Sequence, residues 1–545
     1  MSGIADDWNL ADVWETIADE LVDAPALYHR ELVRSWSEFE DRAARLAAVL
    51  TAHGIGHDAK VAHYLYNGPE YLETTFASFK VRAVPVNVNY RYTDAELLYL
   101  LDNADAEAVV VDHSFAEHVA RLLPQLPKVT LVVEVGGDDE VRSVPSGVAW
   151  LAFEDAIAAA EPAPRIARSG DDLWFLYTGG TTGMPKGVMW PHRSLFGAGA
   201  PTFKGFKLAL PTSLDEVAAA VRTIHADHQP IVLLPAAPLM HGTSAIASWG
   251  VLCAGGAICT LASRSFDPAE LLDAVQRVRV TNLTIVGDAF AKPIISELER
   301  AEAAGAPYDL SSLRLVISSG VMWSQQTKDA LLARADVVCA DLLGSSEGVG
   351  FANSVAKRDR PAPTARFRLG EHARVFTEEG VAVEPGSGVR GLLAVGGPIP
   401  IGYYKDPDKS AGTFRRFDGR VWSVPGDWAT VEADGTITLL GRGSVCINTA
   451  GEKVFPEEVE ETLKTHPAVR DANVVGVPDD KWGQAVVAVL AFEPGASVPV
   501  DELVAHCRET LAGYKVPKRI EIVDAVRRGP NGKADYRWAA SVAAP

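Results

Sequence analysis

Short apolar runs alternate with helical patterns along most of this 545-residue chain, and this alternation constrains its fold more than any other feature. Residues 36–55 carry Phe39, Leu46 and Leu50 at helical spacing before Gly54. Apolar runs without alternation are typical of strands buried on both faces of a parallel sheet. The alternation therefore predicts an α/β fold with layered, mostly parallel sheets. The runs that we predict as strands lie at residues 60–67, 84–89, 107–113, 128–135, 231–238, 281–288, 313–320 and 337–348.

The pattern changes near Arg390, where shorter strands with glycine turns begin. The run TVEADGTITLL predicts a hairpin whose turn contains Asp434 and Gly435. We therefore expect the large N-terminal domain to combine layered sheets and helices with a β-rich subdomain.

A small α+β unit follows Arg442. Pro456 fits the first position of its first helix, because proline lacks the N–H that a helix leaves unpaired at that point. Gly513 is expected to stop its second helix. We therefore predict two domains, residues 1–442 and residues 443–545.

Composition argues against several classes of protein. The net charge is −20 and the sequence pI about 5.1, so the surface repels nucleic acid and anionic membranes. No stretch approaches the ~20 apolar residues that cross a bilayer, and the acidic start lacks the features of a secretory signal. The five cysteines are odd in number and form no C-x-x-C motif, which favours reduced thiols. We expect a cytoplasmic protein with no nucleic-acid partner and no transmembrane segment.

A glycine-rich stretch, TGGTTGMPKGVM at residues 178–189, follows the apolar run at 173–177. Glycines permit positive φ angles and a close approach of the backbone to a ligand. Free backbone N–H groups and threonine hydroxyls form an anion site, and Lys186 adds a mobile charge for phosphate. The spacing matches neither the Walker A pattern nor G-x-G-x-x-G. The stretch predicts a phosphate-binding loop of another kind, and an ordinary flexible loop is the alternative.

The whole stretch YTGGTTGMPKG resembles the phosphate-binding signature of the AMP-forming adenylating enzymes. These include acyl-CoA synthetases, the adenylation domains of peptide synthetases and firefly luciferase. Residues 441–460 and 532–539 are especially similar to actinobacterial acyl-CoA synthetases that act on long-chain or steroid side-chain acids. The other segments that match the family, in its order, are PLMHG at 238–242, SSG at 318–320, GSSE at 344–347, GYYKDP at 402–407, PGD at 425–427, GR at 441–442 and GPNGKADYR at 529–537.

The resemblance implies where ATP binds. A carboxylate must meet the α-phosphate of ATP, so donors and cations that stabilise negative charge are needed. The glycine-rich loop would cover the β- and γ-phosphates, and Glu347 would be the Mg²⁺ ligand, with the Thr178 hydroxyl or water nearby. Asp427 would accept from the ribose hydroxyls. The full set implied for the nucleotide is Thr178, Gly179, Gly180, Thr181, Thr182, Gly183, Lys186, Ser319, Gly320, Gly344, Ser345, Ser346, Asp427 and Arg442.

The resemblance also makes Lys533 the mobile catalytic lysine, which bridges the carboxylate and the α-phosphate. It acts alongside Lys186 and Glu347. In the family, the small C-terminal domain turns about a hinge between two reactions, and such motion can limit turnover. The loop around Gly451 then shapes a channel for the thiol of coenzyme A.

Small residues at the positions that resemble the acyl pocket favour a long or bulky acid. His241 is expected at the entrance of this pocket. Residues 192–233 are longer than in many relatives, and they either cover the acyl tunnel or form a surface insertion. Asp288 lies two residues beyond the point where amino-acid-activating relatives hold an ammonium group, which is a weak match. The residues implied for the acid and the thiol are His241, Val286, Val321, Gly348 and Gly451.

Taken singly, these residues have ordinary structural alternatives. Glu347 alone fits a surface or cap residue, Asp427 a turn residue after glycine, and Lys533 a solvated lysine. His241 alone equally fits a packed, hydrogen-bonded histidine.

The chain departs from the family at four positions. Leu343 replaces a tyrosine that often stacks on adenine, and Ser444 replaces the usual hinge Asp or Lys. Asn448 replaces a common lysine, and Ala450 replaces one of two glycines. Similar replacements occur in the actinobacterial subgroup, so we do not interpret them as loss of activity. How the second reaction is assisted stays open.

The leading hypothesis is an ATP- and magnesium-dependent acyl-CoA synthetase, an AMP-forming ligase of fatty-acid and lipid metabolism. It would convert a carboxylic acid to acyl-AMP and then to acyl-CoA, with release of pyrophosphate and AMP. The alternatives are an adenylating enzyme that serves a carrier protein or another nucleophile, and a silent nucleotide-binding protein. The joint presence of Lys186, Glu347, Asp427, Arg442 and Lys533 argues against the silent protein. A homodimer is one possible assembly.

Overall fold

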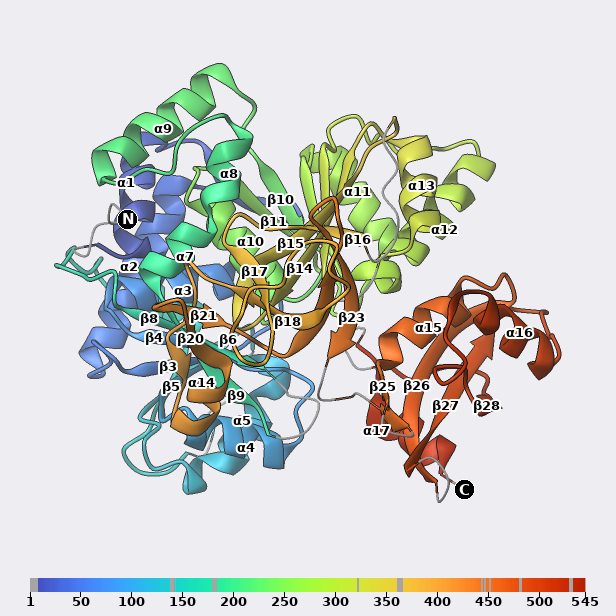
Figure 1. Ribbon diagram of the computed structural model, residues 1–545. Helices are drawn as coiled ribbons and strands as arrows, with labels where there is room; N and C mark the ends of the chain where they lie inside the picture. The colour runs from blue at the N-terminus through green and yellow to red at the C-terminus, as the bar shows by residue number, and fades with distance from the viewer. Residues whose placement is uncertain are drawn as a thin grey trace.

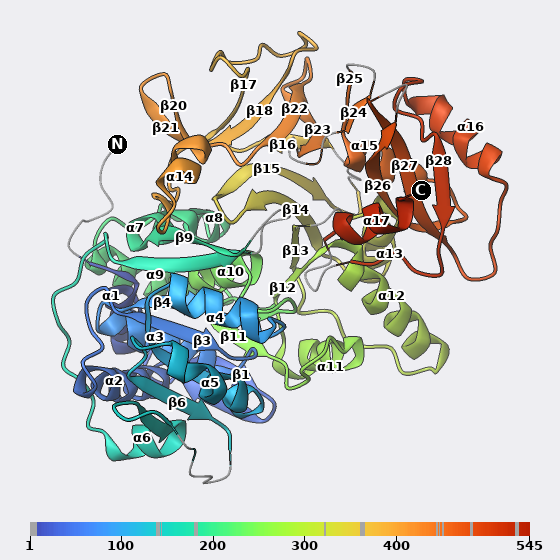
Figure 2. The ribbon, with the colours of Figure 1, turned by 90° about the horizontal axis from the view of Figure 1, so that it is seen from below.

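The computed structural model describes residues 8–544, except for residues 138–141, 143, 179–183, 321–322, 360–365, 443–444, 446, 450–451, 480–482 and 529–532. Two large sheets with their helices form the main body, and a small third sheet lies to one side (Figures 1 and 2). The predicted α/β fold, with parallel sheets and a small C-terminal sheet domain, is confirmed.

The first large sheet is parallel except at the edge that contains β9 and β19. Its eight described strands run in the order β19 (Gly402–Tyr403), β9 (Lys186–Pro191), β8 (Leu173–Thr178), β4 (Val84–Asn87), β3 (Lys60–Tyr64), β5 (Ala106–Asp112), β6 (Leu131–Val135) and β7 (Ala149–Ala152).

Helices cover both faces of this sheet. One face packs against α4 (Asp94–Asn103) and α5 (Ala116–Leu122). The other face packs against α2 (Trp36–Ala52), α3 (Pro69–Lys80) and α6 (Phe153–Ala159). Short 3₁₀ turns flank α5 on both sides.

The second large sheet passes from a parallel region into a β-rich, antiparallel region. In the order of the strands across the sheet given below, those from β1 to β14 run parallel to one another. The strands that come after β14 in this order run antiparallel. Its described strands are β2 (Leu32–Ser35), β1 (Pro25–His29), β11 (Ala257–Thr260), β10 (Val232–Pro235), β12 (Asn282–Ile285), β13 (Leu315–Ser319), β14 (Val338–Ser345), β15 (Gly348–Ala356), β16 (Arg366–Leu369), β23 (Thr436–Arg442), β22 (Asp427–Val431), β18 (Arg390–Val395), β21 (Arg420–Ser423) and β20 (Phe414–Phe417), with β17 (Ala373–Phe376) beside β18.

The main core lies between the two large sheets and contains the buried Trp14, Trp174 and Trp249. The helices that join α2 and α3 in this core are α1 (Leu10–Glu20), α7 (His192–Ala198), α8 (Ala200–Gly205), α9 (Leu214–Asp227) and α10 (Gly242–Leu252). The outer face of the second sheet is covered by α11 (Pro268–Val278), α12 (Gly287–Ala303) and α13 (Gln325–Arg334). The short helix α14 (Pro407–Thr413) follows β19.

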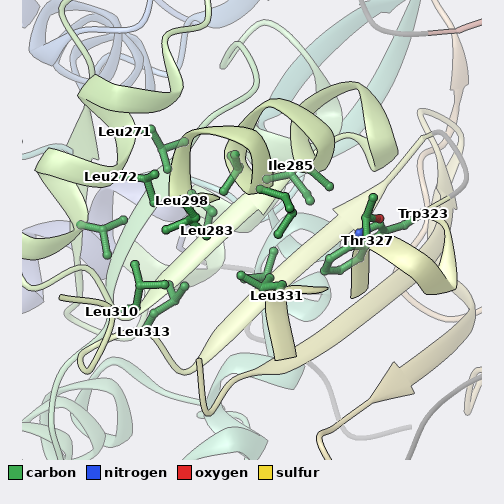
Figure 3. A pocket seen from close by; sticks show the side chains of 15 residues that line it. Leu271, Leu272, Leu283, Ile285, Leu298, Leu310, Leu313, Trp323, Thr327 and Leu331 are labelled. Carbon is green, nitrogen blue, oxygen red and sulfur yellow. The ribbon is translucent and has the colours of Figure 1, made fainter. Parts of the chain in front are cut away.

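A small apolar cavity lies between the second sheet and its outer helices, with Leu283, Ile285 and Trp323 in its wall (Figure 3). Its volume is about 20 Å³. A void of this size admits at most about one water molecule, and an apolar wall offers that water no partners. The cavity is therefore a packing void, and we assign it no chemistry.

The third sheet belongs to the C-terminal part of the chain. Its described strands are β25 (Glu452–Val454), β24 (Ile447–Thr449), β27 (Gly483–Phe492), β26 (Val469–Asp479) and β28 (Arg519–Ile522). Its helices are α15 (Pro456–Lys464), α16 (Val500–Thr510) and α17 (Tyr536–Ala543). Pro456 begins α15, as the sequence predicts. The expected stop at Gly513 is wrong, because Leu511 already has an extended backbone and returns to the core.

Helix α1 is fastened to the core by a buried histidine. The backbone N–H of Leu10 donates to Nδ1 of His192 at 3.0 Å, and the His192 ring packs against Phe79. Burial lowers the pKa of His192 to about 4, because the interior disfavours the charged imidazolium. Within the described part of the chain, no helix combines the length and apolar character needed to cross a bilayer.

The low pKa of His192 predicts how the stability of the fold changes with pH. Between the folded pKa of about 4 and an unfolded pKa of about 6.5, the unfolded chain binds more protons, so acidification across this window destabilises the fold. The contribution reaches about 3 kcal/mol at the acid end of the window. In the variant His192→Asn, which keeps a hydrogen-bond acceptor, the free energy of unfolding should fall less steeply between pH 6.5 and 4.5. Denaturant unfolding at several pH values measures this slope, and equal slopes would contradict the assignment.

Candidate active site

The glycine-rich stretch connects two antiparallel strands. Thr178 ends β8, Lys186 begins β9, and the two residues lie directly opposite each other. Gly187 packs so closely on the Tyr177 ring that a side chain there would meet the ring carbons. The two ends of the stretch are therefore fixed by sheet pairing. The predicted residues Gly179, Gly180, Thr181, Thr182 and Gly183 lie outside the described residues.

A buried amide joins this hairpin to the segment before His241. Asn87, at the end of β4, accepts from the Tyr177 N–H at 2.6 Å and donates to the Tyr177 carbonyl at 2.9 Å. The same side-chain NH₂ group donates to the Met240 carbonyl at 2.7 Å. Asn87 thus holds the residues before Thr178 and His241 side by side. Nothing in the sequence indicates this role, because an asparagine at a strand end is usually a turn residue.

Lys186 forms an ion pair with Asp406, and this pair links the hairpin to the GYYKDP segment. The Lys186 charge helps to hold the pKa of the Asp406 carboxyl below its usual value. The Tyr404 N–H donates to the Gly187 carbonyl at 2.8 Å, so β19 adds to the edge of the hairpin. The resemblance to the family includes the GYYKDP segment but predicts no role for its residues.

Glu347 lies in the turn between β14 and β15, close to the same edge. The Tyr403 hydroxyl donates to Glu347 Oε1 at 2.7 Å, and Ser423 Oγ donates to the Glu347 carbonyl at 2.6 Å. The Trp190 indole N–H donates to the carbonyl of the neighbouring Ser346 at 3.0 Å. Contacts from β9, β19 and β21 therefore fix this turn, which contains the predicted Ser345 and Ser346. The sequence did not predict the Tyr403 contact either.

The loops after β12, β13 and β14 bring together the small residues of the predicted pocket. Gly320 has a φ of 88°, which suits glycine, and a side chain there would contact Val286. A side chain at Gly344 would contact Ser319 and the carbonyl of Gly348. The predicted Val321 lies outside the described residues.

Asp427 and Arg442 are cross-strand neighbours, the first residue of β22 and the last of β23. The hairpin between these strands turns at Gly435, whose φ is 78°, as the sequence predicts. Ser423 contacts Glu347 four residues before Asp427, which places this strand pair beside the β14–β15 turn. The Arg442 side chain, Gly451, Ser444 and Ala450 lie outside what the structure describes.

His241 precedes α10, and its Nε2 atom is buried with no hydrogen-bond partner among the described residues. Burial, together with the charges of Lys533 and Arg91, lowers the pKa of His241 to about 4. The imidazole is therefore neutral near pH 7. Because Coulomb interactions fade with distance, we expect this C-terminal lysine to lie near His241. The sequence did not predict a role for Arg91.

Two further expectations concern the acid. Asp288 accepts from the Ser324 N–H and from the Thr327 hydroxyl, so its carboxylate is held at the start of α13. Residues 192–233 form α7, α8 and α9, and α9 packs against α1 in the main core.

Leu343 packs against the apolar cluster of the β-rich region.

Glu347 and the Thr178 hydroxyl are the groups that suit a hard metal ion. Among the described residues, no three His, Cys, Asp or Glu side chains gather in a way that could hold a metal. A single carboxylate suits Mg²⁺, which usually keeps several waters and binds substrate phosphates.

Two family models match the chain: AMP-binding enzyme over residues 14–404, and AMP-binding enzyme C-terminal domain over residues 458–533. A Mycolicibacterium smegmatis protein, named medium/long-chain-fatty-acid–CoA/3-oxocholest-4-en-26-oate–CoA ligase, is 40% identical over 98% of this chain and 96% of its own. A 3-oxocholest-4-en-26-oate–CoA ligase of Rhodococcus rhodochrous is 40% identical over 97% of this chain and 95% of its own. The crystal structure of ATP-bound MatB from Rhodopseudomonas palustris has a TM-score of 0.78 at 26% identity, and covers 98% of this chain and 99% of its own.

The electrostatic contact between Lys533 and His241 can be tested directly. Replacing Lys533 by Met removes a nearby positive charge, so the pKa of His241 should rise. NMR titration of the labelled imidazole measures this shift. The variant Lys518→Met, in the same C-terminal region, serves as control and should leave the His241 titration unchanged. An unchanged titration in Lys533→Met would contradict the placement of Lys533 near His241.

Proposed function

The chain belongs to the family of AMP-binding enzymes, and from this premise we propose that it is an acyl-CoA ligase. It activates a carboxylic acid with ATP to give acyl-AMP, and then transfers the acyl group to coenzyme A. One observation carries the proposal: Asn87 holds the Thr178 end of the glycine-rich stretch beside the segment before His241. We assign Lys533 of the C-terminal domain as the cation that reaches this region.

In the first reaction a carboxylate oxygen attacks the α-phosphorus of ATP. The bond between this phosphorus and the bridging oxygen breaks, and pyrophosphate leaves with that oxygen. Negative charge grows on the phosphoryl oxygens, so Lys186 and Lys533 stabilise the transition state. Lys186 is 41% exposed in its pair with Asp406, and such exposed pairs are worth about 1 kcal/mol or less, so a triphosphate can replace the carboxylate.

We assign Mg²⁺ to this site as an ion that arrives with ATP. Glu347 and the Thr178 hydroxyl would hold it together with phosphate oxygens, and the Tyr403 hydroxyl orients the Glu347 carboxylate. When bound, Mg²⁺ neutralises part of the phosphate charge. A single protein carboxylate matches the usual preference of this ion.

The adenosine part is assigned to the edge formed by β22, β23 and the β14–β15 turn. Asp427 binds the ribose hydroxyls, with Arg442 opposite it in the strand pair. Ser319, Gly320 and Gly344 supply backbone close to the base and α-phosphate, because small residues let a ligand approach closely. We also retain the predicted role of the glycine-rich residues 179–183, which is to bind the β- and γ-phosphates.

In the second reaction the sulfur of coenzyme A attacks the acyl carbonyl. The bond from the carbonyl carbon to the AMP oxygen breaks, AMP leaves, and the thiol proton passes to solvent. We place the boundary of the two domains between residues 442 and 443. A turn of residues 443–545 about this hinge withdraws Lys533 and brings the loop of Gly451 to the thiol path.

We propose a medium- or long-chain fatty acid, or a bulky steroid side-chain acid, as the substrate. Support comes from the names of relatives that share about two fifths of their residues with nearly the whole chain. The backbone at Gly320 is open, because a side chain there would contact only Val286, whereas Gly348 packs against Val395 and Phe351. Asp288 is engaged with α13, which disfavours it as the ammonium partner of an amino acid.

An adenylating enzyme that serves a carrier protein or an amine remains a distinct hypothesis, but the relatives named as CoA ligases disfavour it. We place the enzyme in the cytoplasm, because Cys253, Cys259, Cys339 and Cys507 are free thiols in the structure. A homodimer stays a prediction, which light scattering can test.

The ligase activity can be tested with a panel of carboxylic acids and ATP. AMP release should require the acid and should become stoichiometric with turnover only when coenzyme A is present. Long-chain and steroid side-chain acids should give a kcat/KM at least about 10-fold above acetate, since each extra buried methylene contributes to binding. Steady AMP release without coenzyme A, but with an amine or a carrier protein, would favour the alternative acceptor.

The assigned roles also predict a split between the half-reactions. Lys533→Ala should slow formation of acyl-AMP by about 100-fold or more, because a cation that stabilises the transition state is lost. Thioester formation from supplied acyl-AMP should change much less. Single-turnover pyrophosphate release and acyl-CoA formation measure the two steps separately. Equal losses in both steps would contradict the catalytic assignment of Lys533.

A further inference from the structure

We propose that Asp471 and Asn473, on β26, are positioning residues that clamp the base of the hairpin that carries Lys533. This inference rests on the proposed function, because it concerns the delivery of the catalytic lysine. Neither residue belongs to a segment that matched the family signature. The hairpin runs from Arg527 to Asp535, and its residues 529–532 lie outside the described residues.

The two faces of β26 have different partners. Ala472 and Val474 point into the core formed with α15 and α16. Val475 and Val477 lie on the opposite face and pack against α17. Because side chains alternate along a strand, Asp471 and Asn473 share this second face. The face is therefore apolar where it holds α17 and polar where the chain that precedes α17 crosses it.

Asp471 binds the first arm of the hairpin through Arg528. Arg528 Nε donates to Asp471 Oδ2 at 2.6 Å, and Nη2 donates to Oδ1, so both carboxylate oxygens are engaged. Each side chain is only about a fifth exposed. A two-point contact between a planar guanidinium and a carboxylate fixes direction as well as distance.

Asn473 binds the same arm one residue earlier. This side chain is fully buried, and its NH₂ group donates to the Arg527 carbonyl at 3.4 Å. The Asp535 N–H donates to the same carbonyl at 3.4 Å, which closes the hairpin base. Arg528 and Ala534 form an antiparallel bridge just above it.

The second arm of the hairpin leads directly into α17. Asp535 caps this helix by accepting from the Trp538 N–H at 2.9 Å. In both views α17 lies on the side of the small sheet that is nearer to the large sheets (Figures 1 and 2). The face of β26 therefore holds both arms of the hairpin.

Lys533 is next to the bridge residue Ala534, and its own side chain is exposed. The hairpin base, one residue away, therefore helps to set the position of its backbone. A displacement of about 1 Å at a reacting group can cost about 100-fold in rate. Loss of the clamp should thus slow the reaction that needs Lys533 and leave the other reaction largely intact.

The test compares Asp471→Asn with Asp471→Glu, Lys533→Ala and the double variant Asp471→Asn/Lys533→Ala, each in the full-length protein. Acyl-AMP formation should fall by about 10- to 100-fold in Asp471→Asn, and Asp471→Glu should recover much of that loss. In the Lys533→Ala background, Asp471→Asn should have almost no further effect, because residues that act through one group are not additive. Glu521→Gln breaks the exposed pair with Arg519 in the same domain and serves as the matched control.

Asn473→Leu provides a second, milder test. It removes the amide donor, keeps a similar volume in a buried place and leaves the Arg528–Asp471 contact in position. The same half-reaction split, with a loss of about 3- to 10-fold in acyl-AMP formation, is expected. Thermal unfolding of each variant shows whether the domain is still folded.

Two outcomes would overturn the clamp. Equal losses in acyl-AMP formation and in thioester formation from supplied acyl-AMP would assign Asp471 a purely structural role. A loss of the same factor with and without Lys533 would show that Asp471 does not act through the lysine. Failure of the proposed function is distinct: the unmodified protein would then release no pyrophosphate with any acid of the panel.

Discussion

The side-chain amide of Asn87 is the interaction on which the geometry of the candidate site depends. Asn87 is 3% exposed and ties the strand before Thr178 to the segment before His241. Unpaired amides and carbonyls are costly in a buried place, so this three-way contact fixes the spacing of the two segments. The glycine-rich stretch can then be free of packing side chains, because both of its ends are held by other elements.

Electrostatics explains why so acidic a chain can act on an anion such as ATP. With a net charge of −20 the overall field opposes the substrate, so cations must act locally. Lys186 is held by Asp406 at the edge of the hairpin, and in the proposed mechanism Lys533 comes from the C-terminal part of the chain. The site therefore gathers positive charge from two elements that the fold brings together.

The sequence correctly predicted features that depend on residues close to one another along the chain. The α/β alternation, the Asp434–Gly435 turn and the start of α15 at Pro456 follow from backbone geometry and from the absence of an N–H in proline. The stop at Gly513 failed because burial of Leu511 ends α16 earlier. Asn87, Tyr403 and Asp471 could not be predicted, because their roles come from partners that are 90, 56 and 57 residues away along the chain.

The contacts between the two parts of the chain suit a domain that turns. Gly441 has a φ of 118°, which suits glycine, and lies against the end of the Glu457 side chain of α15. Beyond it, Trp428 meets Phe455 with ring centroids 6.4 Å apart, and Lys292 faces Glu493 at 4.0 Å in an exposed pair of little energetic weight. The contacts of Asp471 and Asn473 lie instead within the C-terminal part. In a turn about residue 442, as the proposed mechanism requires, Lys533 would move together with the strand that positions it.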